Sequence, residues 1–302
     1  MKAFKIVILS ILGILLSLSL LVFGIALTIN QSLLNPDFVA DHFDEVDIAE
    51  LADEIVRDQI PPEAADFMGD SLEPVLNDVI ADIEDWLKEQ ARDGIYVFYD
   101  YIEGRSEELS LEVSIETMKT TFHDSLLAAI LASPPPELAG DTPAQIEAEF
   151  ETYWSQIDAE IPSTLTLDET MIDATVLEKI EMAKRYVGYF NLGFIILIAF
   201  SALMILLVIL THMAVKGSTR QLGFTFLSVG VVLLAGALIA RSVASGVISG
   251  IDMPATLQGW LPSLITDVLM PLGIYSVGLI VAGIALAVVS FVYKRGEAEF
   301  YY

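Results

Sequence analysis

The run Phe4–Ile29, FKIVILSILGILLSLSLLVFGIALTI, decides the fold, because it carries no charged residue after Lys5. A helix needs about 20 mostly apolar residues to cross the roughly 30 Å hydrocarbon core of a bilayer. The run is also longer than the ~7 to 15 apolar residues of a secretory signal peptide. We therefore predict an uncleaved first membrane-spanning helix.

Three further apolar runs are bounded by polar or charged residues, and they predict three more spans: Tyr189–Leu210, Leu222–Ala240 and Leu272–Tyr293. Lysine and arginine in short flanks mark the cytoplasmic side of a span. The six basic residues of the short flanks all fall on one side: Lys2, Lys5, Lys216, Arg220, Lys294 and Arg295. The sequence thus predicts a multi-pass protein of the cell membrane with both termini in the cytoplasm.

These spans divide the chain into three predicted parts. Residues 1–30 hold the N-terminus and the first span, residues 31–185 form an extracytoplasmic domain, and residues 186–302 hold the other spans. The last part includes an outer link, 242–271, and a cytoplasmic tail. Lys184 and Arg185 lie on the extracytoplasmic side against the charge rule, but large domains translocate largely regardless of charge.

The charge of the chain is concentrated in the extracytoplasmic segment. Asn30–Arg185 holds 38 Asp and Glu against 8 Lys and Arg, a net charge of −30, whereas the whole chain carries −27. Such a surface repels nucleic acid. We expect membrane lipid and a cationic or protein partner of this domain as the binding partners, and no nucleic acid. A saline habitat, simple solubility and cation binding are three alternative explanations of this acidity.

The fold class is predicted to be mainly α, with a small two-stranded β element in the acidic domain. Apolar residues recur at helical spacing, or capping residues begin a helix, in these segments: Asn35–Phe43, Asp47–Ile60, Ser71–Gln90, Glu116–Leu131, Pro143–Ile157 and from Glu169 onward. Ile95–Ile102 favours helix weakly. Leu109–Ile115 alternates apolar and polar residues, and Thr164–Leu167 is a second short strand. We expect the two strands to pair and to pack on helices, because an isolated pair is marginal in water.

Several short motifs are spread over most of the chain: Leu34-Asn35-Pro36-Asp37-Phe38, the acidic helix around Asp47 to Leu51, Tyr101-Ile102-Glu103-Gly104, Thr117-Met118-Lys119 and Arg220-Gln221-Leu222-Gly223. In these motifs the chain resembles a group of uncharacterised prokaryotic four-span membrane proteins. The resemblance implies an α-rich extracytoplasmic domain inserted after the first span. It implies no particular activity.

The predicted spans contain no ionisable residue at their cores, which proton relays and voltage sensors require. Arg241 lies near the outer end of the third span, and Trp260 lies in the outer link. Both are expected to be interfacial anchors. Gly236, Ala240 and Ala244 recur every four residues and form a candidate helix-packing seam. We favour packing within the bundle, and the alternative is the seam of a homo-oligomer.

No catalytic motif is present: the chain has no cysteine, no H-E-x-x-H, no G-x-S-x-G and no phosphate-binding glycine loop. His42, His123 and His212 are far apart, so we expect no metal, no cofactor and no enzymatic activity. The leading hypothesis is a membrane protein whose extracytoplasmic domain binds a partner, senses or scaffolds at the cell envelope. The alternative is an oligomeric pore or a transport accessory subunit.

We predict that single cysteines at Ser133 and Ser218, introduced into this cysteine-free chain, label from opposite sides of the membrane. An impermeant maleimide on intact cells should label Ser133→Cys and spare Ser218→Cys, because the Val215–Gln221 loop is expected in the cytoplasm. The reverse pattern would invert the topology.

Overall fold

The computed structural model describes residues 2–46, 72–132, 134, 140, 142–212, 214–248 and 255–292. These residues are mainly helical and include a two-stranded sheet, which confirms the predicted fold class. The chain divides into two compact units. The membrane unit comprises Met1–Phe38, Tyr186–Asp252 and Leu261–Tyr302, and the acidic unit comprises Val39–Arg185 and Met253–Trp260.

Four helical segments are long and apolar enough to cross a membrane, which confirms the four predicted spans: Phe4–Gln31, Ala174–His212, Val215–Ala244 and Gly259–Val292. They belong to α1 (Lys2–Gln31), α8 (Ala174–His212), α9 (Val215–Ile248) and, for the last one, α10 (Ala255–Val268) with α11 (Met270–Val292). Each helical segment is longer than the apolar run from which the span was predicted. The outer link 242–271 is accordingly helical over much of its described length.

α9 and α11 approach each other closely, and Gly223, Gly230 and Gly283 make this approach possible. A Cβ added at Gly283 would lie 2.7 Å from the Leu227 nitrogen and 2.8 Å from the Gly223 oxygen. One added at Gly230 would lie 2.8 Å from the Ser276 oxygen. Small residues at such positions let two helix backbones meet within a membrane.

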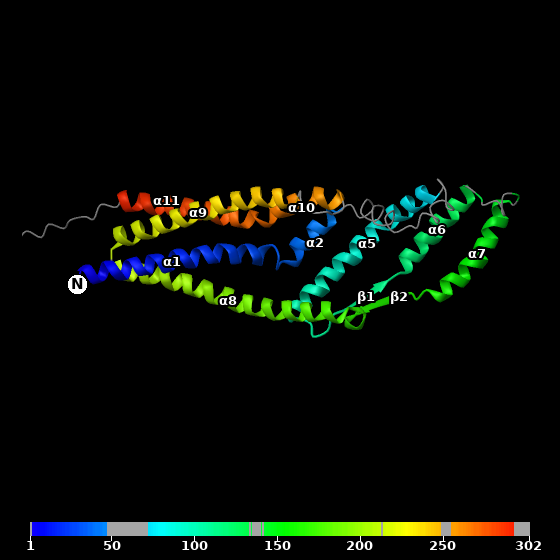
Figure 1. Cartoon of the computed structure of the whole chain (residues 1–302), viewed down its shortest axis with the longest axis horizontal. Coiled ribbons are helices and arrows are strands. Elements are labelled where there is room, and N and C mark those ends of the chain that lie inside the picture. Colours follow the sequence, from blue (N-terminus) through cyan, green and yellow to red (C-terminus); the bar gives the residue numbers. More distant parts are fainter. Residues whose placement is uncertain are drawn as a thin grey trace, which may run out of the picture. The chain divides into compact units, whose positions relative to one another are not determined.

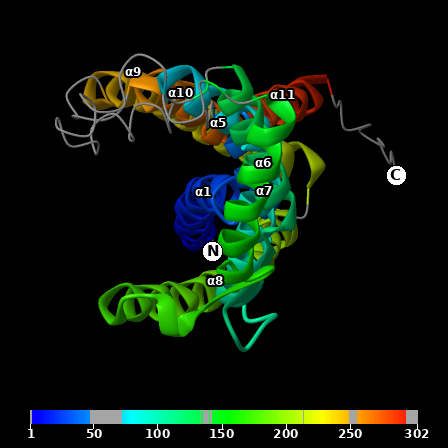
Figure 2. The ribbon, with the colours of Figure 1, turned by 90° about the vertical axis from the view of Figure 1, so that its right-hand side faces the viewer.

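Helix α1 lies between the α9–α11 pair and α8 (Figures 1 and 2). Ser19 and Ser201 share a hydrogen bond of 2.5 Å between α1 and α8, and the rings of Phe23 and Phe194 stack with centroids 5.7 Å apart. On its other side α1 meets α11, where the Tyr275 hydroxyl donates to the Leu20 carbonyl at 3.3 Å. The apolar core of this unit includes Leu12, Leu16, Leu20, Met204, Val208, Leu222, Val229, Leu233, Leu272 and Leu279.

The acidic unit contains helices α2 (Pro36–Asp44), α5 (Leu72–Ile102), α6 (Glu116–Ala132) and α7 (Pro143–Glu160), of which α2 begins in the membrane unit. Each matches a predicted helix, and α5 runs on through the weakly predicted 95–102 segment. The helix predicted at Asp47–Ile60 lies outside the described residues. Buried residues of this unit include Tyr99, Tyr101, Ile102, Val113, Ile115, Ile146, Phe150 and Trp154.

The helix predicted to start directly at Glu169 does not do so. A 3-10 turn, η2 (Glu169–Met171), comes first, and α8 begins at Ala174. Two aspartates cause the break. The Asp168 carboxylate accepts from the Thr170 amide at 2.9 Å, and the Asp173 carboxylate accepts from the Thr175 amide at 2.8 Å. Each caps its own helical start, so the chain begins a helix twice.

The two predicted strands pair, as expected. Strand β1 (Ser110–Ser114) is antiparallel to β2 (Thr164–Asp168), with Glu112 opposite Thr166. β1 packs on α5, where the Trp86 indole donates to the Ser114 carbonyl at 3.2 Å. Val113 in β1 is buried.

The proposed cysteine probe at Ser218 needs replacing. The Ser218 side chain is buried and its hydroxyl donates to the Ala214 carbonyl at 3.1 Å, so a thiol there would react slowly. The predicted Val215–Gln221 loop is helical, because α9 begins at Val215. Lys216, in the first turn of α9, is exposed and serves the labelling experiment better.

We predict that Gly283→Ala destabilises the membrane unit and that Gly278→Ala, on the same helix, does not. The new methyl at Gly283 would overlap the α9 backbone, which costs about 1 to 3 kcal/mol. A Cβ at Gly278 would meet no described atom within 4 Å. Thermal unfolding of the full chain in one detergent measures both, and equal midpoints would contradict the packing described here.

Candidate functional site

The α6–α7 hairpin carries a histidine between two carboxylates. His123 Nδ1 lies 2.8 Å from Asp124 Oδ1, and Nε2 lies 2.9 Å from Glu151 Oε1. Its ring packs on Phe150 and Trp154, with centroids 5.2 and 5.1 Å away. An ionised carboxylate only accepts hydrogen bonds, so both ring nitrogens donate and the geometry suits the charged imidazolium.

Lys119 lies one turn before His123 on α6 and is buried. Its ammonium lies 2.6 Å from the Asp158 carboxylate and donates to the carbonyls of Asp158 at 3.2 Å and Ile161 at 3.3 Å. All three ammonium protons therefore have an acceptor. These acceptors lie at the C-terminal end of α7, where a cation offsets the helix dipole. Lys119 therefore joins α6 to the C-terminal end of α7 and stabilises the hairpin.

A second polar cluster joins α5 to the first turns of α8. The Tyr101 hydroxyl donates to Glu181 Oε1 at 2.6 Å, and the Lys184 ammonium lies 3.7 Å from the centroid of the Tyr101 ring. The hydrogen bond to Glu181, with burial, raises the pKa of Tyr101. Tyr101 thus stays neutral and acts as a buried hydrogen-bond donor. Two ion pairs of Arg92, with Asp41 and Asp44, join α5 to α2 in a similar way.

Strand β2 presents an open edge. Thr164, Leu165, Thr166 and Leu167 are all exposed, and among the described residues the sheet has only two strands. The Ile115 amide donates to the Ser163 carbonyl at 3.1 Å, so Ile115 and Ser163 are a hydrogen-bonded pair. Hydrogen-bonded pairs alternate with non-hydrogen-bonded ones in an antiparallel sheet. The backbone groups of Thr164 and Thr166 accordingly face away from β1.

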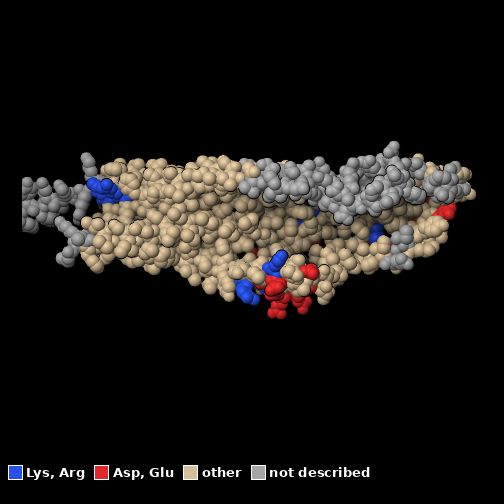
Figure 3. Space-filling model, viewed as in Figure 1, with Lys and Arg blue, Asp and Glu red and all other residues tan. Residues whose placement is uncertain are grey.

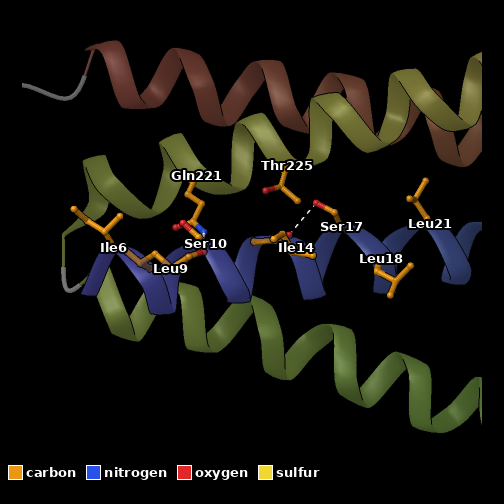
Figure 4. Close-up of a pocket in the computed structure, with 10 residues that line it drawn as sticks. Ile6, Leu9, Ser10, Ile14, Ser17, Leu18, Leu21, Gln221 and Thr225 are labelled. Atoms are coloured by element: carbon orange, nitrogen blue, oxygen red, sulfur yellow. Dashed lines mark hydrogen bonds between the residues drawn. The ribbon is translucent and has the colours of Figure 1, made fainter. Parts of the chain in front are cut away.

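The membrane unit contains a groove of about 580 Å³ between α1 and α9. Its lining residues are Ile6, Leu9, Ser10, Gly13, Ile14, Ser17, Leu18, Leu21, Gln221 and Thr225 (Figure 4). The Gln221 side chain donates to the Leu9 carbonyl at 2.7 Å, and its oxygen lies 2.7 Å from His212 Nε2. These contacts tie α1, α8 and α9 together at one end of the groove.

The candidate packing seam lies away from the glycines that bring α9 and α11 together. Gly236 and Ala240 are exposed, and Ala244 is half-buried. A Cβ added at Gly236 would meet no described atom within 4 Å. Whether these residues contact another helix, within the chain or in a second copy, stays a prediction.

Both predicted anchors donate a hydrogen bond to a backbone carbonyl. The Arg241 guanidinium donates to the Thr266 carbonyl at 3.3 Å, and its Nε is buried with no hydrogen-bond partner among the described residues. The Trp260 indole donates to the His42 carbonyl at 3.0 Å. Their interfacial role stays a prediction.

Sequence reasoning missed the pairing of His123 with Glu151, because 28 residues separate them and only the hairpin brings them together. A faint signal existed, since Phe150 and Trp154 are one turn apart on α7 and would face one side of a partner helix. In the described part of the chain, no three His, Asp or Glu residues lie close enough to hold a metal ion.

Comparison with known proteins identifies no relative. No family model, no curated protein and no solved structure matches the chain. The resemblance to uncharacterised four-span proteins therefore stays a prediction, and the functional argument depends on the residues alone.

We predict that the α6–α7 hairpin is more stable at pH 6 than at pH 8.5. The hydrogen bond to Asp124, and then Glu151, raises the pKa of His123, while burial lowers it. A raised pKa gives stability that is complete below the unfolded value of about 6.5 and is lost as pH rises through the folded pKa. Because the carboxylates are largely exposed, the effect is less than about 1 kcal/mol.

Amide hydrogen exchange of α6 and α7 in the full chain, corrected for intrinsic rates, measures this pH effect. His123→Gln should remove the difference between the two pH values. Equal protection of the wild-type hairpin at both pH values would show that the imidazolium makes no contribution.

Proposed function

We propose that the chain is a non-enzymatic four-span membrane protein whose acidic unit, on the extracytoplasmic side, binds a protein partner by strand addition at β2. The open edge of β2 carries this proposal. An unpaired strand edge presents free N–H and C=O groups and is a ready template for an incoming strand. Soluble proteins commonly protect such edges with lysine, proline or a covering helix.

No such protection is present on β2 itself. The strand holds no lysine and no proline, and Leu165 and Leu167 are 38% and 40% exposed. Met171, just beyond the strand, is 62% exposed. Exposed apolar residues beside unpaired backbone groups favour a partner that supplies both hydrogen bonds and apolar contacts.

The side chains of the sheet indicate the chemistry of that partner. Glu112 and Asp168 lie on the same face of the sheet as Thr166, and the two leucines lie on the other. An incoming strand that alternates basic and apolar residues would match both faces. This partner agrees with the net charge of −30 on the surrounding segment.

The pore alternative has less support. Buried hydroxyls of the spans are bonded within the bundle: Thr28 to the Gly24 carbonyl, Ser276 to the Leu272 carbonyl and Ser290 to the Lys216 carbonyl. Hydroxyls bonded in this way satisfy helix carbonyls and do not need water. A sensing or scaffolding role is compatible with partner binding and would act through the same edge.

We predict that a photo-crosslinking amino acid at Leu167 in the full chain, in its native membrane, captures one protein partner. The same probe at Thr152, an exposed position on α7, is the control. Thr166→Pro should lower the Leu167 cross-link at least about tenfold, because it removes a hydrogen bond and puts a proline ring in the path of an added strand.

Thr166→Val is the matched variant, since it keeps the edge amide and the β-branched shape. It should leave the cross-link unchanged. Because the Thr166 amide faces away from β1, the proline variant should keep the β1–β2 ladder, which hydrogen exchange of Val113 verifies. Equal cross-linking by the proline and valine variants would remove strand addition as the mode of binding.

A further inference from the structure

We infer that the groove between α1 and α9 binds one anionic phospholipid of the leaflet at the Lys5 end, with an acyl chain along α1 and its headgroup among Lys5, Lys216 and Arg220. The groove and the basic cluster are independent observations. The groove supplies the space for an acyl chain, and the basic residues supply the positive charge for a headgroup.

The groove has the dimensions of a chain-like molecule. Its α1 lining runs from Ile6 to Leu21, which spans about 22 Å at 1.5 Å per residue. A volume of about 580 Å³ over that length gives a mean cross-section of roughly 26 Å². A long, narrow groove of this kind suits an extended acyl chain.

The part of α1 that lines the groove carries both small and large side chains. Gly13 and Ser17 are among the lining residues, and the Ser17 hydroxyl donates to the Gly13 carbonyl of its own helix at 2.9 Å, the dashed line in Figure 4. Ile14 and Leu18 are 68% and 58% exposed along the rim. Because this hydroxyl is bonded within its own helix, an acyl chain beside Ser17 leaves that donor paired.

Charge complementarity identifies the headgroup. Lys5 directly precedes the groove residue Ile6, and Arg220 directly precedes Gln221. Both are exposed, as is Lys216 one turn before Arg220. Basic side chains are visible at this end of the membrane unit (Figure 3), and Lys5, Lys216 and Arg220 form no salt bridge with any described acid.

The acids of the described membrane unit lie elsewhere along the helices. Asp37 follows the far end of α1, and Asp267 precedes α11. Among the described residues, the basic end of this unit therefore holds no acid that would compete with a bound anion. Basic residues at the cytoplasmic or matrix ends of helices, beside a pocket between them, are the usual recognition chemistry for anionic lipid headgroups.

Native mass spectrometry of the full chain in detergent tests the inference, with phosphatidylglycerol and phosphatidylcholine of the same acyl chains as probes. Wild type should bind phosphatidylglycerol more tightly. Lys216→Gln with Arg220→Gln should reduce that preference, by about fivefold for each charge removed. Phosphatidylcholine binding should stay unchanged in this double variant.

Filling the groove tests the acyl chain separately. Ser17→Leu should weaken binding of both lipids by about tenfold. Ser228→Leu is the matched control, because Ser228 is an exposed serine of α9 outside the groove whose hydroxyl also donates within its own helix, to the Thr225 carbonyl at 3.0 Å. It should bind both lipids as wild type does.

Three results would overturn the inference. Equal binding of the two lipids by wild type would remove the headgroup site. A preference for phosphatidylglycerol that Ser17→Leu leaves intact would restrict the interaction to the basic surface. A dimer that Ser17→Leu dissociates, with no bound lipid, would assign the groove to a second copy of the chain.

Discussion

The need to pair every backbone group inside a membrane governs the rest of this structure. Helices meet that need within themselves, but they must still find one another without help from the hydrophobic effect. Gly223, Gly230 and Gly283 solve the second problem by bringing α9 and α11 into backbone contact. α1 is then placed against this pair by side chains alone, and the looser fit leaves a groove along its serine and glycine positions.

In the acidic unit, a small number of basic residues join the helices to one another. Lys119, Arg92 and Lys184 each contact more than one group, so a few cations hold several elements together. The excess acids stay at the surface. Strand β2 differs from the other elements. It has no charged residue before Asp168, and among the described residues no strand pairs with its outer edge. The acidic unit therefore exposes one strand edge of mixed polar and apolar character.

The sequence predicted the elements better than their contacts. Apolar length identified the spans, and alternation identified both strands, because each signal is local. The break between η2 and α8 was missed, since two capping aspartates compete with the helical pattern that follows them. The groove and the His123 cluster were also missed. Both arise from residues such as Leu9 and Gln221, or His123 and Glu151, that meet only after distant helices have packed.

The bond from Gln221 to the Leu9 carbonyl has a consequence for biosynthesis. Its two ends are 212 residues apart in the sequence. At a synthesis rate of about 5 to 20 residues per second, Gln221 is therefore made roughly 10 to 40 seconds after Leu9. During that interval the whole acidic segment is translated. The first span therefore resides in the bilayer as a single helix, its serines and glycines facing lipid or the insertion machinery, long before the bundle that will shelter them exists.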